Sequence, residues 1–364
     1  MTDRERFVRT LTGRPVDRVP FMKIFGGANA IKPHWEDEHP GIGECIDERL
    51  GFEGRGRGWD RPPVNTDLSR TGPVEILEET DEHVTRRFRT GKVEVTRKGG
   101  DYNRHTVEWP VGDRASWERV QAEHLDPDDP SRFPTNWPGL VAEYADRDWP
   151  MQLTHRGAYG FPRELVGDEN LAYLFYDDPA LVHDILNTYT DVTIAIWEKL
   201  VADVEFDLIE CWEDMAFRDG SLISPRMFRE FLAPQYGKVA TFAKEHGIEI
   251  ILVDSDGYVE ELTALMQEAG VTALYPYEVQ SGNDVARVRA RFPEFACLGG
   301  LDKQVMARGK GAIDAEIERA RELIKLGRFI PGPDHFVLSD VSFANYRYFM
   351  ERLRDVVMTT EPRQ

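Results

Sequence analysis

Acidic side chains recur directly after apolar runs in the C-terminal half of this 364-residue sequence. Glu210 and Asp214 follow FDLI, Asp254 and Asp256 follow IEIILV, and Glu278 follows VTALYPY. Carboxylates gathered at one edge of a fold repel one another unless a metal ion, a shared proton or a cationic substrate is present. The alternative for any single acid is a helix cap, as Asp254 or Asp256 could provide for the helix that follows.

Two further runs end in ionisable groups. Asp302 and Lys303 follow FACLGGL, and Asp334 and His335 follow FIPGP. Imidazole is a proton shuttle at neutral pH and a common metal ligand, so His335 is a candidate for either role, with Asp334 orienting it. A solitary histidine is often only structural, but the position of this one directly after an apolar run favours function.

Candidates for substrate binding follow the run MQLT, where His155 and Arg156 form a basic pair shortly before Tyr159. Arginine binds carboxylates in bidentate geometry, so we expect this pair to hold a substrate carboxylate. Pairing of Arg156 with a nearby acid is the alternative. Lys23 and Asp302 are further candidates. An aromatic lining, with ordinary core packing as its alternative, could come from Trp35, Trp59, Trp137 and Trp212.

The apolar runs that carry these groups alternate with helical segments. A long helix is expected from about Asp178 to Val201, and another from Ser224-Pro225 to Gly247. The runs begin near residues 206, 248, 272, 295 and 328, which leaves about one βα unit between neighbours. This spacing predicts a single (β/α)8 TIM barrel over residues 1–364, whose reactive groups gather at the C-terminal ends of the strands. An open doubly wound sheet is the alternative, but Gly26-Gly27-Ala28 lacks the GxGxxG spacing.

The N-terminal part is less regular. A helix is expected from Thr2 or Asp3 to Gly13, and a buried strand over 18–25. Residues 26–80 predict long loops and short helices, because Gly, Pro and Trp are frequent and no period is sustained. The segment 83–111 alternates like β-strands and has turn signals at Thr90-Gly91 and Gly99-Gly100, which predicts an antiparallel β-meander inserted into the barrel.

Composition limits the classes of function. There are 45 basic and 65 acidic residues, a net charge of -20, which disfavours nucleic acid and anionic membranes as partners. No stretch resembles a membrane span or a signal peptide, so we expect a cytoplasmic protein. Cys45, Cys211 and Cys297 form no CxxC pair, so neither a disulfide framework nor a standard structural zinc site is indicated.

Several segments together resemble the uroporphyrinogen decarboxylase superfamily. The opening TDRERFVRTLTGRPVDRVPFM resembles its N-terminus. Four later segments resemble the C-terminal half of the family in order and spacing. They are SLISPRMFREFLAPQYGKV, ILVDSDG, LGGLDKQVMARGKGAIDAEIERARELI and GRFIPGPDHFVLSDVSFANYRYFMERLR. The resemblance implies a single barrel. It also implies one of two chemistries: cofactor-independent decarboxylation of a polycarboxylate porphyrinogen, or methyl transfer to or from a corrinoid protein at a zinc ion held by a His-x-Cys pair and a later cysteine.

The sequence departs from both patterns. KIFGGANAIKPHW has no arginine pair, so the anion cradle of the decarboxylases is expected to be missing. The zinc pair of the methyltransferases falls on Asp254 and Asp256, and the later cysteine on His335. Oxygen and imidazole ligands leave zinc a harder Lewis acid than thiolates do, as polarisation of an ether oxygen requires. We therefore expect Asp254 or Asp256, Glu278 and His335 to bind zinc.

The resulting hypothesis is zinc-assisted demethylation of a small O-methyl substrate with transfer to a corrinoid protein. In it, Glu210 and Asp214 bind substrate or transfer protons, as Asp256 and His335 also could. One alternative is a metal-independent decarboxylase in which Asp256 or His335 protonates a carbanion. A non-catalytic receptor for a small ligand is the other. The resemblance implies a separate corrinoid-carrying partner and a homodimer.

Overall fold

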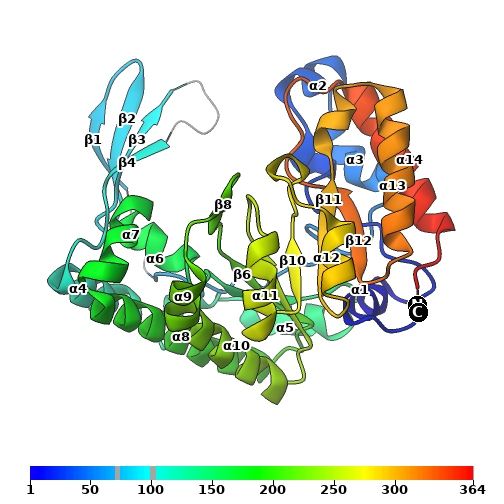
Figure 1. Ribbon diagram of the computed structural model, residues 1–364. Helices are drawn as coiled ribbons and strands as arrows, with labels where there is room; N and C mark the ends of the chain where they lie inside the picture. Colours follow the sequence, from blue (N-terminus) through cyan, green and yellow to red (C-terminus); the bar gives the residue numbers. More distant parts are fainter. Residues whose placement is uncertain (70–73, 99–103, 364) are drawn as a thin grey trace.

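The computed structural model describes residues 1–69, 74–98 and 104–363. It is an α/β fold with a parallel sheet, flanking helices and a separate antiparallel sheet (Figure 1). The first element, α1 (Asp3–Thr12), begins at a capping box in which Thr2 and Glu5 exchange hydrogen bonds. It ends at Gly13, whose φ of 68° is left-handed. The predicted N-terminal helix is therefore confirmed with both of its boundaries.

The parallel sheet has six strands in the order β12-β11-β10-β9-β6-β5. Each strand lies beside the strand that precedes or follows it in the chain, as repeated βα units require, with a separate two-stranded hairpin inserted between β6 and β9. The bounds are β5 (Gln152–His155), β6 (Leu208–Trp212), β9 (Ile250–Asp254), β10 (Ala273–Tyr275), β11 (Ala296–Leu301) and β12 (Phe329–Pro333). All six lie within the apolar runs expected to be strands, so the parallel α/β architecture is confirmed.

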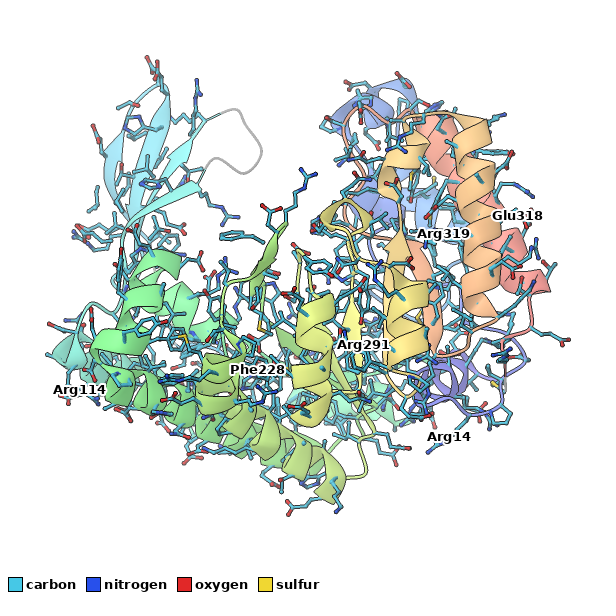
Figure 2. The ribbon with its side chains drawn as sticks, in the orientation of Figure 1. Arg14, Arg114, Phe228, Arg291, Glu318 and Arg319 are labelled. Carbon is cyan, nitrogen blue, oxygen red and sulfur yellow. The ribbon has the colours of Figure 1, made fainter. Side chains whose placement is uncertain are left out.

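Helices cover the outer face of this sheet. Asp178 caps α8 (Pro179–Val201), and Ser224 caps a helical segment that changes type at Phe228 before continuing as α10. Figure 2 shows the side chains on this frame, with Arg319 reaching from α13 toward β11, where its Nη2 donates to Gly300 O at 2.6 Å. The helices after β5 are α6 (Gly160–Val166), α7 (Asp168–Asp177), α8, α9 (Pro225–Met227), η3 (Phe228–Leu232), α10 (Ala233–Glu245), α11 (Glu260–Glu268), η4 (Val279–Ser281), α12 (Val285–Arg291), η5 (Lys303–Met306), α13 (Lys310–Ile324) and α14 (Phe343–Thr359).

The inner face of the sheet packs on N-terminal segments. One apolar cluster joins Leu208, Leu252 and Leu298 of the strands to Phe7 and Leu11 of α1. Met22, Ile24 and Trp59 belong to the same cluster. The segment 18–25 is therefore largely buried as expected, but it is not a strand: Ile24 has a φ of 44°, which interrupts an extended backbone.

Residues 26–69 form loops and short helices, as predicted, namely η1 (Gly27–Ala30), α2 (Pro33–Glu38) and α3 (Ile42–Leu50). The antiparallel sheet also exists, with the order β1-β2-β3-β4. Its strands are β1 (Glu75–Glu79), β2 (His83–Arg87), β3 (Val93–Arg97) and β4 (Arg104–Glu108). It begins earlier than position 83, because β1 pairs with β2. The predicted turn at Thr90-Gly91 is present, and Gly99-Gly100 lies outside the described residues.

The antiparallel sheet stands beside α6 and α7 (Figure 1). Between the antiparallel sheet and β5 the chain forms α4 (Arg114–His124), η2 (Pro130–Arg132) and α5 (Trp137–Ala145). After β6 it forms a hairpin of β7 (Ala216–Phe217) and β8 (Gly220–Ser221). Among the helices of the described residues, none is long and apolar enough to span a membrane.

Candidate active site

A cavity of about 410 Å³ opens at the C-terminal ends of β5, β6 and β9. That volume suits a small molecule. The polar and aromatic side chains around it include Arg57, Trp59, Arg61, Thr154, Arg156, Glu210, Trp212 and Asp254. We call this space the central cavity. It brings together arginines from the irregular N-terminal region and five of the predicted site residues, namely His155, Arg156, Glu210, Trp212 and Asp254.

The deepest polar group of the central cavity is a network around the hydroxyl of Tyr275. This hydroxyl donates to Glu210 Oε1 and lies 2.9 Å from Asp254 Oδ2. Arg57 Nη1 donates to Tyr275 Oη at 2.8 Å and to Asp254 Oδ2 at 3.4 Å. Burial, and then the nearby Glu210 carboxylate, raise the pKa of Asp254 well above its usual value. Burial thus favours the protonated form of Asp254 more than it is favoured in an exposed carboxyl group, and this acid lies beside the hydroxyl of Tyr275.

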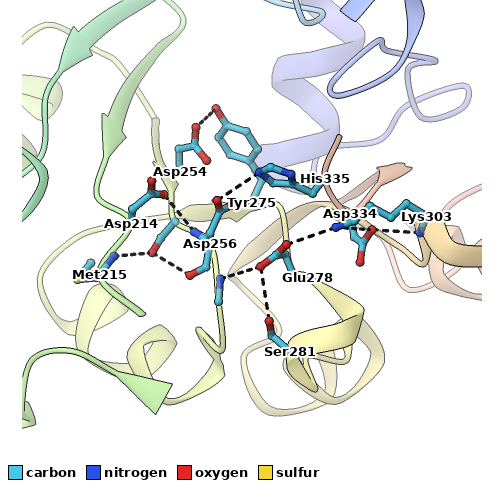
Figure 3. A network of polar contacts seen from close by, with 12 residues as sticks. Asp214, Met215, Asp254, Asp256, Tyr275, Glu278, Ser281, Lys303, Asp334 and His335 are labelled. Carbon is cyan, nitrogen blue, oxygen red and sulfur yellow. Dashed lines mark hydrogen bonds and ion pairs between the residues drawn. The ribbon is translucent and has the colours of Figure 1, made fainter. Parts of the chain in front are cut away.

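A second network joins Asp214, Asp256 and His335 next to the first (Figure 3). His335 Nε2 lies 3.2 Å from Asp256 Oδ2, and the Asp256 N–H donates to Asp214 Oδ1 at 3.3 Å. Burial, and then the charge of Asp256, raise the pKa of Asp214 to about 6. The ring of His335 stacks on Phe25 with centroids 4.9 Å apart. These predicted residues are thus brought together, but outside the lining of the central cavity.

A third group lies at the ends of β10 to β12. Lys303 Nζ is 3.3 Å from Glu278 Oε1 and 3.6 Å from Asp334 Oδ1. Glu278 Oε2 accepts the Gly257 N–H, and Asp334 accepts the N–H groups of Val279 and Lys303. Both carboxylates are therefore occupied by an internal ammonium ion and by backbone donors. We had expected Asp334 to orient His335, but Asp334 instead contacts Lys303 and Val279.

The predicted zinc ligands do not fit a metal ion as they are arranged. Across residues 1–69, 74–98 and 104–363 no three His, Cys, Asp or Glu side chains converge as a metal site needs. The reason is local: Glu278 faces the ammonium of Lys303, and Asp254 faces Arg57 and Tyr275. His335 contacts Asp256 through Nε2 and packs its ring on Phe25 and Phe336. Lys303 and Arg57 thus lie against two of the expected ligands, Glu278 and Asp254, while Asp256 and His335 pair with each other.

Four expected substrate-binding groups have other roles. His155 packs its buried ring on Tyr189 and Trp197, and burial lowers its pKa to about 3, so it is neutral and cannot hold an anion as a cation. Tyr159 is buried, and its backbone N–H donates to Glu213. Lys23 Nζ binds Asp47 at 2.6 Å. Asp302 caps η5 by accepting the N–H of Gln304.

Arg156 and Trp212 fit their predicted roles better, since both line the central cavity and the guanidinium lies 4.1 Å from the indole centroid. Trp59 also lines the cavity. Trp35 and Trp137 do not: their indole N–H groups donate to Val341 O and Asp203 Oδ2.

The sequence analysis missed Arg57, Arg61 and Tyr275. The first two lie in GRGRGWDR, where glycines allow tight turns that bring arginines to the rim; Gly58, for example, has a φ of 125° and no room for a Cβ beside Met22. With Arg156, they give the central cavity three guanidinium groups. KIFGGANAIKPHW has no arginine, as noted from the sequence, and the guanidinium groups of the central cavity come from other segments.

Comparisons with known proteins agree with this architecture. Residues 158–356, more than half of the chain, match the family described as uroporphyrinogen decarboxylase (URO-D). A uroporphyrinogen decarboxylase of Nocardia farcinica is 28% identical over 155 residues, which cover 42% of this chain and only 41% of that protein. The chain thus aligns with about two fifths of the length of that relative.

Among solved structures, a methyltransferase from Methanosarcina mazei superposes with a TM-score of 0.63 over 98% of both chains at 18% identity, which establishes a common fold. Both relatives bear the names of enzymes, as the sequence analysis expected. The chain belongs to the uroporphyrinogen decarboxylase family.

Proposed function

We propose that this protein is a metal-independent carboxy-lyase acting on a small carboxylic acid bound in the central cavity. The observation that carries the proposal is the buried acid Asp254, which faces this cavity together with Arg57. Arg61 has no acidic partner among the described residues, so its guanidinium is free to bind an anion. A carboxylate held there would lie in the same cavity as a proton donor.

The proposed reaction replaces a carbon–carbon bond by a carbon–hydrogen bond. The bond between the carboxylate and its carbon breaks, the electron pair stays on that carbon, and CO2 leaves. The carbon takes the proton of Asp254, and the new Asp254 carboxylate is stabilised by Arg57 and Tyr275. Solvent then returns a proton to Asp254, so no net charge accumulates. The cavity of about 410 Å³ favours a small acid over a porphyrinogen with many carboxylates.

The test is release of labelled CO2 from a panel of aryl and alkenyl carboxylic acids labelled with carbon-13 in the carboxyl group. Asp254→Asn removes the proton but keeps the shape, and should lower the rate about 10²- to 10⁴-fold, as loss of a general acid does. Asp256→Asn is the matched variant, because that acid lies outside the central cavity. If Asp254→Asn retains activity while Asp256→Asn loses it, the assignment of the acid is wrong.

Methyl transfer is the second candidate, because the same acid could protonate the oxygen left when a methyl group departs. In that case the methyl group passes to a corrinoid protein, as in the demethylation hypothesis drawn from the sequence. Incubation with O-methyl aromatic acids and free reduced cobalamin, followed by absorbance of the methylated corrinoid, separates it from decarboxylation. Zinc is part of neither proposal, since the residues at the expected ligand positions do not fit it.

We also propose that the sheet closes into a barrel of eight segments within one domain. Asp60 and Met151 form a parallel bridge beside β5, and the Ile24 N–H donates to Arg57 O at 2.7 Å. On the far side, Ile24 packs close to Gly332 of β12. These contacts support the proposal, because they lead from β5 through residues 57–60 and 22–24 toward β12. Homodimerisation and a cytoplasmic location remain predictions.

A further inference from the structure

A second cavity of about 510 Å³ lies between the antiparallel sheet and α6. We call it the side cavity. Its apolar walls are Leu68, Phe88, Pro110, Phe161 and Leu165, which come from four separate segments. Two of these side chains are aromatic, and Phe161 is itself held by stacking on Tyr189 at a centroid distance of 3.7 Å. Such walls suit a flat, apolar body.

The charged groups around the side cavity divide into paired and unpaired ones. Lys92 Nζ binds Glu94 at 2.8 Å, and its remaining neighbour is Glu164 at 3.7 Å. Arg89 and Arg104 also line the cavity, are exposed, and have no acidic partner in the described part of the chain. Once the pairs are formed, two free guanidinium groups remain, which attract an anion.

Shared lining residues place the side cavity next to the central cavity. A linking space of about 400 Å³ shares Arg61, Thr154 and Arg156 with the central cavity, and Asn65 and Asp67 with the side cavity. Arg156 marks the passage: its Nε lies 3.7 Å from Asp67 and its Nη2 3.8 Å from Glu164. Its Nε is buried and makes no hydrogen bond to any described residue, so a donor is left over at the junction.

We propose that the side cavity is a second substrate-binding subsite, built in part by the antiparallel sheet. Its apolar walls hold an aromatic ring of the substrate, and Arg89 and Arg104 bind an anionic group attached to that ring. This inference rests on the proposed function in one respect: the other end of the substrate is the carboxylate in the central cavity. The substrate class is then an elongated aromatic acid with an anionic group at each end. The β-meander insertion thereby acquires a role in substrate choice.

The experiment uses two probes of one shape and different charge, 2-naphthoate and the neutral 2-naphthamide, titrated into the full-length protein by calorimetry. We expect 2-naphthoate to bind and the double variant Arg89→Ala/Arg104→Ala to weaken it about tenfold or more, as loss of charge-assisted contacts does. Binding of 2-naphthamide should change less than threefold. Arg97→Ala, on the same sheet but away from the cavity, is the matched control and should leave both affinities unchanged.

Two further variants make the outcome decisive. Leu165→Trp fills the side cavity and should abolish binding of both probes, whereas Arg61→Ala acts only on the central and linking cavities. If Arg61→Ala removes 2-naphthoate binding and the Arg89/Arg104 pair does not, the probe binds in the central cavity and the inference is overturned. If Arg97→Ala weakens 2-naphthoate binding as much as the Arg89/Arg104 double variant does, the effect is one of overall charge, and the inference is overturned as well. None of these results depends on turnover, so the proposed lyase can fail while the subsite stands, and the reverse.

Discussion

Asp254 Oδ2 lies 2.9 Å from the hydroxyl of Tyr275, and that hydroxyl also contacts Glu210, the acid from the neighbouring strand β6. Because β6, β9 and β10 are adjacent and parallel, residues at their ends meet at one level of the sheet. A single hydroxyl therefore connects two carboxyl groups. The proton transfer that we propose for Asp254 uses this connection.

Tyr275→Phe should lower the rate of CO2 release about 10²-fold, because it removes both the relay and the group that stabilises the Asp254 carboxylate after proton transfer. The substituted ring keeps its packing against Phe25 and Trp59, so the midpoint of thermal unfolding should change little. The rate and the midpoint are measured on the same preparation.

Tyr159→Phe is the matched control for that prediction. Its ring is buried at the start of α6, but no described residue forms a hydrogen bond with its hydroxyl, so activity should stay within about twofold. Equal losses in both variants would mean that Tyr275 acts through packing alone.

Asp214 should make the protein less stable as pH rises. Its folded pKa, raised to about 6 by burial and the charge of Asp256, lies above the ordinary value of 3.8. The native state thus binds more protons than the unfolded state between these values, and the free energy of unfolding falls as pH rises through the interval. Asp214→Asn removes this term, so its stability relative to wild type should increase by on the order of 1 to 3 kcal/mol between pH 4 and pH 7.

Urea unfolding at several pH values measures the difference, with Asp219→Asn on the exposed hairpin as control. A wild-type minus variant difference that is flat between pH 4 and pH 7 would contradict the assignment.

Local patterns were enough to predict the elements that carry the site. The strands β9 and β12 are apolar nearly throughout, β6 is apolar apart from Glu210, and α1 has a capping box and a C-terminal glycine, so both kinds of element follow from a few neighbouring residues. The acids after the strands were predicted for the same reason, because strand direction alone decides where they lie.

The partners of these acids could not be predicted in this way. Arg57 reaches Asp254 across 197 positions of sequence, and Lys303 reaches Glu278 from the next strand end. Whether an acid meets a metal, a lysine or a hydroxyl depends on side-chain packing between distant segments. The zinc hypothesis shows this limit: the ligand positions resemble a metal site in sequence, while in the structure Lys303 lies against Glu278 and Arg57 against Asp254.

Lys303→Met should destabilise the protein by about 3 to 5 kcal/mol, because it leaves Glu278 and the fully buried Asp334 without their cation. In the double variant Lys303→Met/Glu278→Gln part of this loss should be recovered, since one of the uncompensated charges is gone. Denaturant unfolding of the four proteins of this cycle gives the coupling free energy.

The same cycle examines the fit of metal. Zinc should leave the unfolding midpoint of the wild-type protein unchanged and should raise that of Lys303→Met, where Glu278 and Asp334 lack a cation. A zinc-dependent rise in the wild-type protein as well would show that Lys303 does not occupy the cation position.

Glu213 should hold the loop that carries Arg156. Its carboxylate is fully buried and accepts the N–H groups of Ala158, Tyr159 and Gly160 as well as the hydroxyl of Tyr236. In Glu213→Gln the side-chain NH2 group replaces one of the accepting oxygens and faces N–H and O–H donors. The free energy of unfolding should fall by about 2 to 4 kcal/mol, because buried donors lose their acceptor.

The specific readout for Glu213 is hydrogen exchange at residues 158–160, since these amides lose their acceptor. Exchange there should accelerate at least tenfold more than in β9, whose amides belong to the sheet. Glu164→Gln is the matched control, because that acid contacts the Arg156 guanidinium but none of these amides. If exchange rises equally in the loop and in β9, Glu213 stabilises the whole fold; if it rises only in the loop and 2-naphthoate binding weakens, the carboxylate sets the position of Arg156.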